Sequence, residues 1–130
     1  MIDFTKYNVL AVDDVPLNLL LVEKMLARFK FRIRKASGGR QALEEISQEK
    51  PDLILLDLMM PEIDGFEVLR RVRENPETSG IRVVILSALN STEDIVRGYQ
   101  MGANDFITKP IIMEKLVNCV ATQLQLIKNS

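Results

Sequence analysis

The sequence contains no histidine and only one cysteine, Cys119. Without histidine the chain cannot form a Ser-His-Asp triad or a histidine-ligated zinc site, and it lacks the commonest general base of enzymes. A single cysteine excludes both an internal disulfide and a cysteine-cluster metal site. Any chemistry must therefore use carboxylates, hydroxyls, lysines and bound ions.

Long hydrophobic runs and an excess of one charge are also missing. No apolar stretch approaches the ~20 residues that span a bilayer, and residues 1–6 lack the layout of a secretory signal. Lys+Arg 17 against Asp+Glu 18 leaves a net charge of -1, which gives no electrostatic footprint for nucleic acid or an anionic membrane. We therefore expect a cytoplasmic protein without a membrane partner and without direct nucleic-acid binding.

Strand and helix patterns alternate along the chain, which predicts an α/β domain with a parallel sheet. Apolar runs at 9–12, 53–56 and 83–86 are continuous, as in strands that are covered on both faces. The strand at 31–34 alternates apolar and charged residues and the strand at 106–108 is short, so both belong at the edges. The chain is predicted to form one domain over its 130 residues, with a flavodoxin-like, doubly wound, five-stranded sheet in the order 2-1-3-4-5 and five helices.

The first and fourth helices show which side chains are expected to face the core. The fourth helix is capped either by Asn90 with Glu93 or by Ser91 with Asp94, and it ends at Gly102. Apolar residues at helical spacing are Leu17, Leu20, Leu21, Met25 and Phe29 in the first helix, and Ile95, Val96 and Tyr99 in the fourth.

Polar residues stand where the predicted strands end. Asp13 and Asp14 follow the first strand, Asp57 the third, Ser87 the fourth and Lys109 the fifth. Parallel strands bring these residues to one edge, where open α/β sheets hold their ligands. Three carboxylates repel one another unless a cation lies among them, and Mg²⁺ prefers hard oxygen ligands. The pattern predicts a site for a divalent cation and a phosphoryl group.

Each of these residues also has an ordinary structural interpretation. Asp13 and Asp14 can form a turn and a helix N-cap. Ser87 can be a strand-end turn residue, and Lys109 a solvated surface charge. Asp57 is harder to explain in this way, because an aspartate that ends four buried aliphatic residues has no capping role.

In this order and spacing, the motifs resemble the receiver domain of two-component response regulators. The resemblance covers roughly residues 7–127, and it implies a phosphorylation-dependent switch in a phosphorelay rather than a turnover enzyme. The phosphoryl group would come from a histidine kinase or a histidine phosphotransfer protein. The motifs are Asp13-Asp14, Leu55 to Pro61 with Asp64-Gly65, Ser87-Ala88 and Lys109-Pro110.

The resemblance also implies residue roles around the phosphoacceptor. Asp57 would accept the phosphoryl group as an acyl phosphate. Asp14 and Asp57 would bind Mg²⁺, for which Mn²⁺ can substitute, together with the backbone carbonyl of Met59, and Asp13 would assist through water. Lys109 would hold a phosphoryl oxygen.

A second set of implied roles concerns the signal. Ser87 would bond another phosphoryl oxygen and move toward Asp57, and the family couples this movement to the position of Phe106. Many relatives carry tyrosine there, so Phe106 is either a working switch or a plain edge-strand core residue. The Lys109–Pro110 bond is a candidate cis peptide.

The fourth helix, fifth strand and fifth helix are expected to form the output surface, which is also the candidate homodimer interface. Met59 and Leu89 lie two residues beyond Asp57 and Ser87, and both are apolar, so slow self-hydrolysis is expected. The output would be a downstream protein or an effector domain that this sequence does not contain. Both a complete single-domain regulator and a piece of a longer protein fit.

Three other functions fit the sequence less well. A Mg²⁺-dependent phosphohydrolase with an aspartyl-phosphate intermediate generally needs a second acid two residues after its nucleophile, where this chain has Met59. A degenerate receiver that is never phosphorylated is disfavoured, since every matching position is filled. A nucleotide-binding flavodoxin-like module is disfavoured because no glycine-rich phosphate loop follows a strand.

Overall fold

The computed structural model describes residues 3–128 and contains one sheet of five parallel strands. The sheet order is β2-β1-β3-β4-β5, which confirms the predicted order and the flavodoxin-like class. The strands are β1 (Asn8–Val12), β2 (Arg32–Ala36), β3 (Leu53–Leu56), β4 (Arg82–Ser87) and β5 (Asp105–Thr108).

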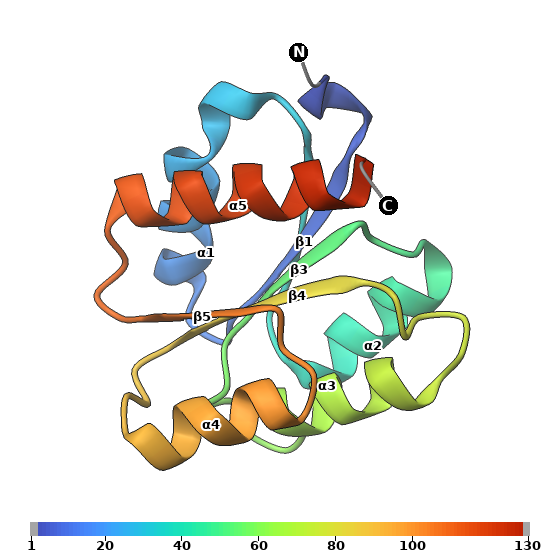
Figure 1. Cartoon of the computed structure of the whole chain (residues 1–130), viewed down its shortest axis with the longest axis vertical. Helices are drawn as coiled ribbons and strands as arrows, with labels where there is room; N and C mark the ends of the chain where they lie inside the picture. Colours follow the sequence, from blue (N-terminus) through green and yellow to red (C-terminus); the bar gives the residue numbers. More distant parts are fainter. Residues whose placement is uncertain (1–2, 129–130) are drawn as a thin grey trace.

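Five α-helices cover the two faces of this sheet, with α1 and α5 on one face and α2, α3 and α4 on the other (Figure 1). Among the described residues, no helix combines the length and the apolar composition needed to cross a membrane. The helices are α1 (Pro16–Met25), α2 (Gly39–Gln48), α3 (Gly65–Glu74), α4 (Thr92–Gln100) and α5 (Met113–Lys128), with single 3₁₀ turns η1 (Phe4–Lys6) and η2 (Ala27–Phe29).

The three central strands are buried except at Arg82, the partly buried first residue of β4, and their side chains alternate between the two helical layers. In β3, Ile54 and Leu56 contact the layer of α2, α3 and α4, whereas Leu53 and Leu55 contact the layer of α1 and α5. Continuous apolar sequence is required because both faces of these strands are covered.

The buried face of α1 differs from the expected one. Leu19 and Val22 are buried, together with Leu26 just after the helix, whereas Leu17 is 60% exposed and Leu20 and Leu21 are also exposed. Aliphatic residues occur on all sides of this helix, so spacing alone does not determine which side packs against the sheet. Met25 and Phe29 of the expected set pack against the core, but the expectation was wrong for the three leucines.

The ends of α4 follow the sequence, but its predicted inner face does not. Ser91 caps the helix by accepting a hydrogen bond from the Asp94 N–H at 3.1 Å, and Gly102 follows it with a φ of 105°. Val96 and Tyr99 are nearly half exposed, and the buried position is Gly98. The helix packs on β5 through this glycine, so the expectation for Val96 and Tyr99 was wrong.

Two leucine substitutions separate these two faces of the first helical segment. Leu26→Ala should lower the free energy of unfolding by about 2–5 kcal/mol because it leaves a cavity. Leu20→Ala should change it by less than about 0.5 kcal/mol, since that side chain already lies in solvent. Urea denaturation of both variants tests the assignment, and equal losses would contradict it.

Candidate functional site

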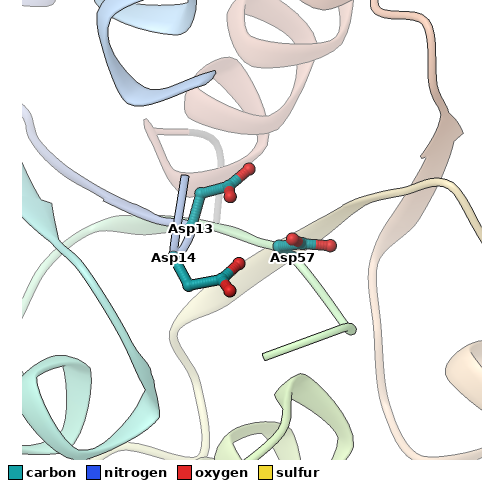
Figure 2. A group of neighbouring side chains, drawn as sticks. All are labelled: Asp13, Asp14 and Asp57. Atoms are coloured by element: carbon teal, nitrogen blue, oxygen red, sulfur yellow. The ribbon is translucent and has the colours of Figure 1, made fainter. Parts of the chain in front are cut away.

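Three aspartates meet where β1 and β3 end. β1 and β3 pair in parallel with Val12 opposite Leu56, so the residues that follow them lie side by side. The Asp57 N–H donates to the Val12 carbonyl at 3.0 Å and continues this pairing. Carboxylate oxygens of Asp13, Asp14 and Asp57 lie within 4.8 Å of one another (Figure 2).

Lys109 brings a positive charge to this cluster from the end of β5. Its Nζ lies 2.9 Å from Asp13 Oδ2 and 3.6 Å from Asp57 Oδ2. The Lys109 N–H donates to the Ser87 carbonyl at 2.8 Å, so the residue is held against the end of β4. The Lys109–Pro110 peptide bond is cis. One ammonium group therefore faces two of the three carboxylates.

The carboxyl group of Asp57 has a perturbed pKa. Its side chain is buried, and this burial raises the pKa of the carboxyl above its ordinary value. The Lys109 charge opposes the rise, the Asp13 charge adds to it, and the Met59 N–H, which donates to Asp57 Oδ1 at 3.3 Å, opposes it. The net rise means that the ionised form needs more positive charge than Lys109 supplies.

Ser87 and Phe106 occupy the neighbouring strands β4 and β5. Ser87 is fully buried, and its Oγ accepts a hydrogen bond from the Leu89 N–H at 3.2 Å. Phe106 is partly buried and packs against the core layer that contains α4. In this arrangement the Ser87 hydroxyl stabilises its own loop, and Phe106 supports α4.

Gly65, the first residue of α3, shapes the loop after Asp57 through a close backbone approach. A Cβ added at Gly65 would lie 2.2 Å from the Asp57 carbonyl oxygen, and the Gly65 N–H donates to the Leu58 carbonyl at 3.0 Å. Any side chain would push the loop after Asp57 away from α3. The Asp64-Gly65 pair was the available signal, but the close approach depends on the packed structure.

The donor set fits a hard divalent cation. The described residues bring three carboxylates together, and carboxylate oxygens are what Mg²⁺ and Mn²⁺ prefer. Asp13 and Asp57 are buried while Asp14 is more accessible, which leaves the cluster open on one side. Burial and mutual repulsion both favour a cation that lowers the net negative charge.

The raised pKa of Asp57 has a consequence for stability. Because the folded state holds the Asp57 proton more tightly than the unfolded chain does, ionisation above the ordinary pKa of 3.8 disfavours folding. Asp57→Asn should therefore raise the melting temperature by a few degrees near neutral pH, and the gain should disappear as pH falls below that value.

Magnesium should reverse this difference. At a hundred times its dissociation constant, a cation bound only to the folded state adds about 2.7 kcal/mol to parent stability, and Asp57→Asn should gain much less. Thermal melts of the parent and of Asp57→Asn between about pH 3 and 8, with and without MgCl₂, measure both effects. A destabilised Asp57→Asn at neutral pH without metal would contradict the analysis.

Comparison with known proteins agrees with this geometry. The family described as response regulator receiver domain matches residues 9–121. The probable cyclic di-GMP phosphodiesterase of Vibrio cholerae is 38% identical over 96% of this chain, which spans only 28% of that protein. Protein PilH of Pseudomonas aeruginosa is 35% identical over 87% of this chain and 93% of its own length.

Solved structures give the same result. The receiver domain of a putative LuxO repressor protein from Vibrio parahaemolyticus is 33% identical, with a TM-score of 0.89 over 94% of this chain and 92% of that one. The Mn²⁺-bound form of response regulator Rcp1 is 28% identical, with a TM-score of 0.78 over 89% and 90% of the two chains. The chain belongs to the family of response regulator receiver domains.

Proposed function

We propose that the chain is a phosphorylation-dependent signalling switch in which Asp57 accepts a phosphoryl group in the presence of Mg²⁺. The observation that carries the proposal is the convergence of one buried carboxylate, two further carboxylates and one ammonium group at the carboxyl edge of the sheet. The donor would be the phosphohistidine of a kinase or a phosphotransfer protein, because receiver domains act with such partners.

Asp57 is the nucleophile in this proposal. One of its carboxylate oxygens forms a bond to phosphorus while the bond from phosphorus to the donor nitrogen breaks, and the electron pair of that bond leaves with the imidazole. The ionised carboxylate is the reactive form, and a cation in addition to Lys109 would offset the remaining effect of burial on Asp57.

Lys109 would stabilise the charge that spreads over the phosphoryl oxygens during transfer. Its Nζ already lies between Asp13 and Asp57, so a small movement of a flexible side chain suffices to contact a group on Asp57. Asp13, Asp14, Asp57 and the Met59 carbonyl would hold Mg²⁺, or Mn²⁺ in its place. When bound, the cation supplies charge neutralisation and orientation.

The response to phosphorylation would start at Ser87. Its hydroxyl, which now accepts a hydrogen bond from the Leu89 N–H, would donate one to a phosphoryl oxygen and draw the loop before α4 toward Asp57. Phe106 lies against α4 on the next strand and is placed to follow this movement. The surface of α4, β5 and α5 would then carry the signal to a downstream protein, to an effector domain or to a second copy.

This proposal treats the chain as a single receiver domain in the cytoplasm that does not turn over a substrate. The whole-protein activity named for the Vibrio cholerae relative is not assigned here, since the chain spans 28% of that protein. A phosphohydrolase is the weaker candidate, because Met59 offers no acid two residues beyond Asp57.

Intact mass after incubation with acetyl phosphate and MgCl₂ tests the proposal. The parent should gain one phosphoryl group, and Asp57→Asn should gain none. Lys109→Ala should slow the gain by about a hundredfold, as for the loss of one electrostatic contact to a transition state. Glu44→Gln, at an exposed acid on α2, is the control and should behave as the parent. Equal labelling of parent and Asp57→Asn would refute the proposed acceptor.

The lifetime of the acyl phosphate should depend on Met59. This side chain is 55% exposed and, with Leu89, lines an open groove beside the loop after Asp57. Met59→Asn should speed phosphate loss several-fold, because a polar amide can hold water near the phosphorus. Met113→Asn, at a methionine that is 53% exposed on α5, provides the control. Phosphate release from purified phosphorylated protein measures both rates, and matching rates would exclude this role.

A further inference from the structure

One carboxylate joins three elements at the edge of the sheet. Asp105, the first residue of β5, accepts hydrogen bonds from the Tyr99 hydroxyl of α4 at 3.2 Å and from the Cys119 thiol of α5 at 3.1 Å. It also accepts a hydrogen bond at 2.8 Å from the N–H of Phe106, the next residue of β5. Because α4 and α5 cover opposite faces of the sheet, these bonds reach around the edge strand (Figure 1).

The donors of this bridge keep their protons at neutral pH. Burial, the hydrogen bond to Asp105 and the charge of Asp105 raise the pKa of Cys119 to about 12. Burial, then the same carboxylate, raises the pKa of Tyr99. Both groups therefore donate and Asp105 accepts, so the bridge depends on the negative charge of Asp105.

The packing between α4 and β5 leaves little room for movement. A Cβ added at Gly98 would come within 2.9 Å of Ile85 Cδ1 and 3.2 Å of Phe106 Cδ2, so the helix backbone lies directly on these two side chains. A shift of α4 must displace the Phe106 ring or move the helix along the strand. Either change alters the position of Tyr99 relative to Asp105.

The far end of α4 is anchored. Arg73 of α3 donates from Nε to the Gly102 carbonyl at 2.9 Å and from Nη2 to Asn104 Oδ1 at 2.9 Å. A pull on the loop between Ser87 and α4 should therefore tilt the helix about its C-terminal end. The Tyr99–Asp105 bond is already 3.2 Å long, and a lengthening of a few tenths of an ångström removes most of its strength.

We propose that the hydrogen-bonded bridge Tyr99–Asp105–Cys119 transmits the state of the phosphoacceptor site from α4 to α5. Phosphorylation of Asp57 tilts α4 and breaks the Tyr99–Asp105 hydrogen bond. The Asp105 carboxylate then keeps its hydrogen bonds from the Cys119 thiol and the Phe106 N–H. Phe106 has no hydroxyl, and Tyr99 supplies the polar contact that responds to helix position. This inference rests on the proposed function.

The fluorescence emission of Tyr99 reports the Tyr99–Asp105 hydrogen bond. The chain has no tryptophan and two tyrosines, so Tyr7→Phe leaves Tyr99 as the sole emitter. A carboxylate bonded to the phenol quenches its emission by accepting the proton in the excited state. Treatment with acetyl phosphate and MgCl₂ should raise the emission at least about twofold, since loss of one bond to a charged acceptor shifts the bonded population by roughly tenfold. Tyr7→Phe/Asp105→Asn should emit strongly before treatment and should not respond to it.

Thiol labelling reports the Cys119–Asp105 hydrogen bond, because Cys119 is the single cysteine. The thiolate is the reactive form, and an Asp105 carboxylate without the Tyr99 donor holds the Cys119 proton more tightly. In the parent, phosphorylation should therefore lower the labelling rate several-fold, whereas Tyr99→Phe should label more slowly at rest and lose the response. Asp57→Asn, treated in the same way, should show no change in either readout.

The two proposals fail in different ways. A parent that gains no phosphoryl mass would overturn the proposed function and this inference together. A parent that is phosphorylated, yet shows unchanged Tyr99 emission and Cys119 labelling, would overturn the inference alone.

Discussion

Repulsion among three carboxylates is the constraint around which this molecule is organised. Two unit charges 4 Å apart repel by about 4 kcal/mol at an effective dielectric constant near 20, and burial adds a solvation cost for Asp57. The parallel pairing of β1 with β3 forces Asp13 and Asp57 together despite this cost. Lys109 offsets part of it from β5. The apolar core of the central strands must supply the remaining stability, and the unbalanced negative charge is of the kind that a bound cation would offset.

Much of the fold and of the site could be predicted because the relevant information lies at strand ends. Uninterrupted aliphatic runs identify the three central strands, and the alternating segment that became β2 identifies an edge. Once the order is known, topology alone brings Asp13, Asp57 and Lys109 to one edge. Side chains that follow a buried strand have few places to go, so their proximity follows from connectivity.

Other features depend on tertiary packing, which the local sequence does not determine. Leu17 and Leu20 satisfy helical spacing as well as Leu19 and Val22 do, and only packing on the sheet selects between them. Asn90 and Ser91 are both residue types that cap helices. The helix begins at the position that makes Ser91 the N-cap. The contacts of Asp105 with Tyr99 and Cys119 join residues from three elements, and no spacing rule connects them. Tertiary structure alone supplies these answers.

The ion pair between Lys109 and Asp13 joins residues 96 positions apart. Such a contact forms only after the intervening strands and helices have taken their places, since the entropy of closing so long a loop opposes earlier pairing. A chain still emerging from the ribosome therefore holds its aspartates without their lysine until β5 is complete. In such a chain the repulsion between Asp13 and Asp57 lacks the positive charge that offsets it in the folded domain.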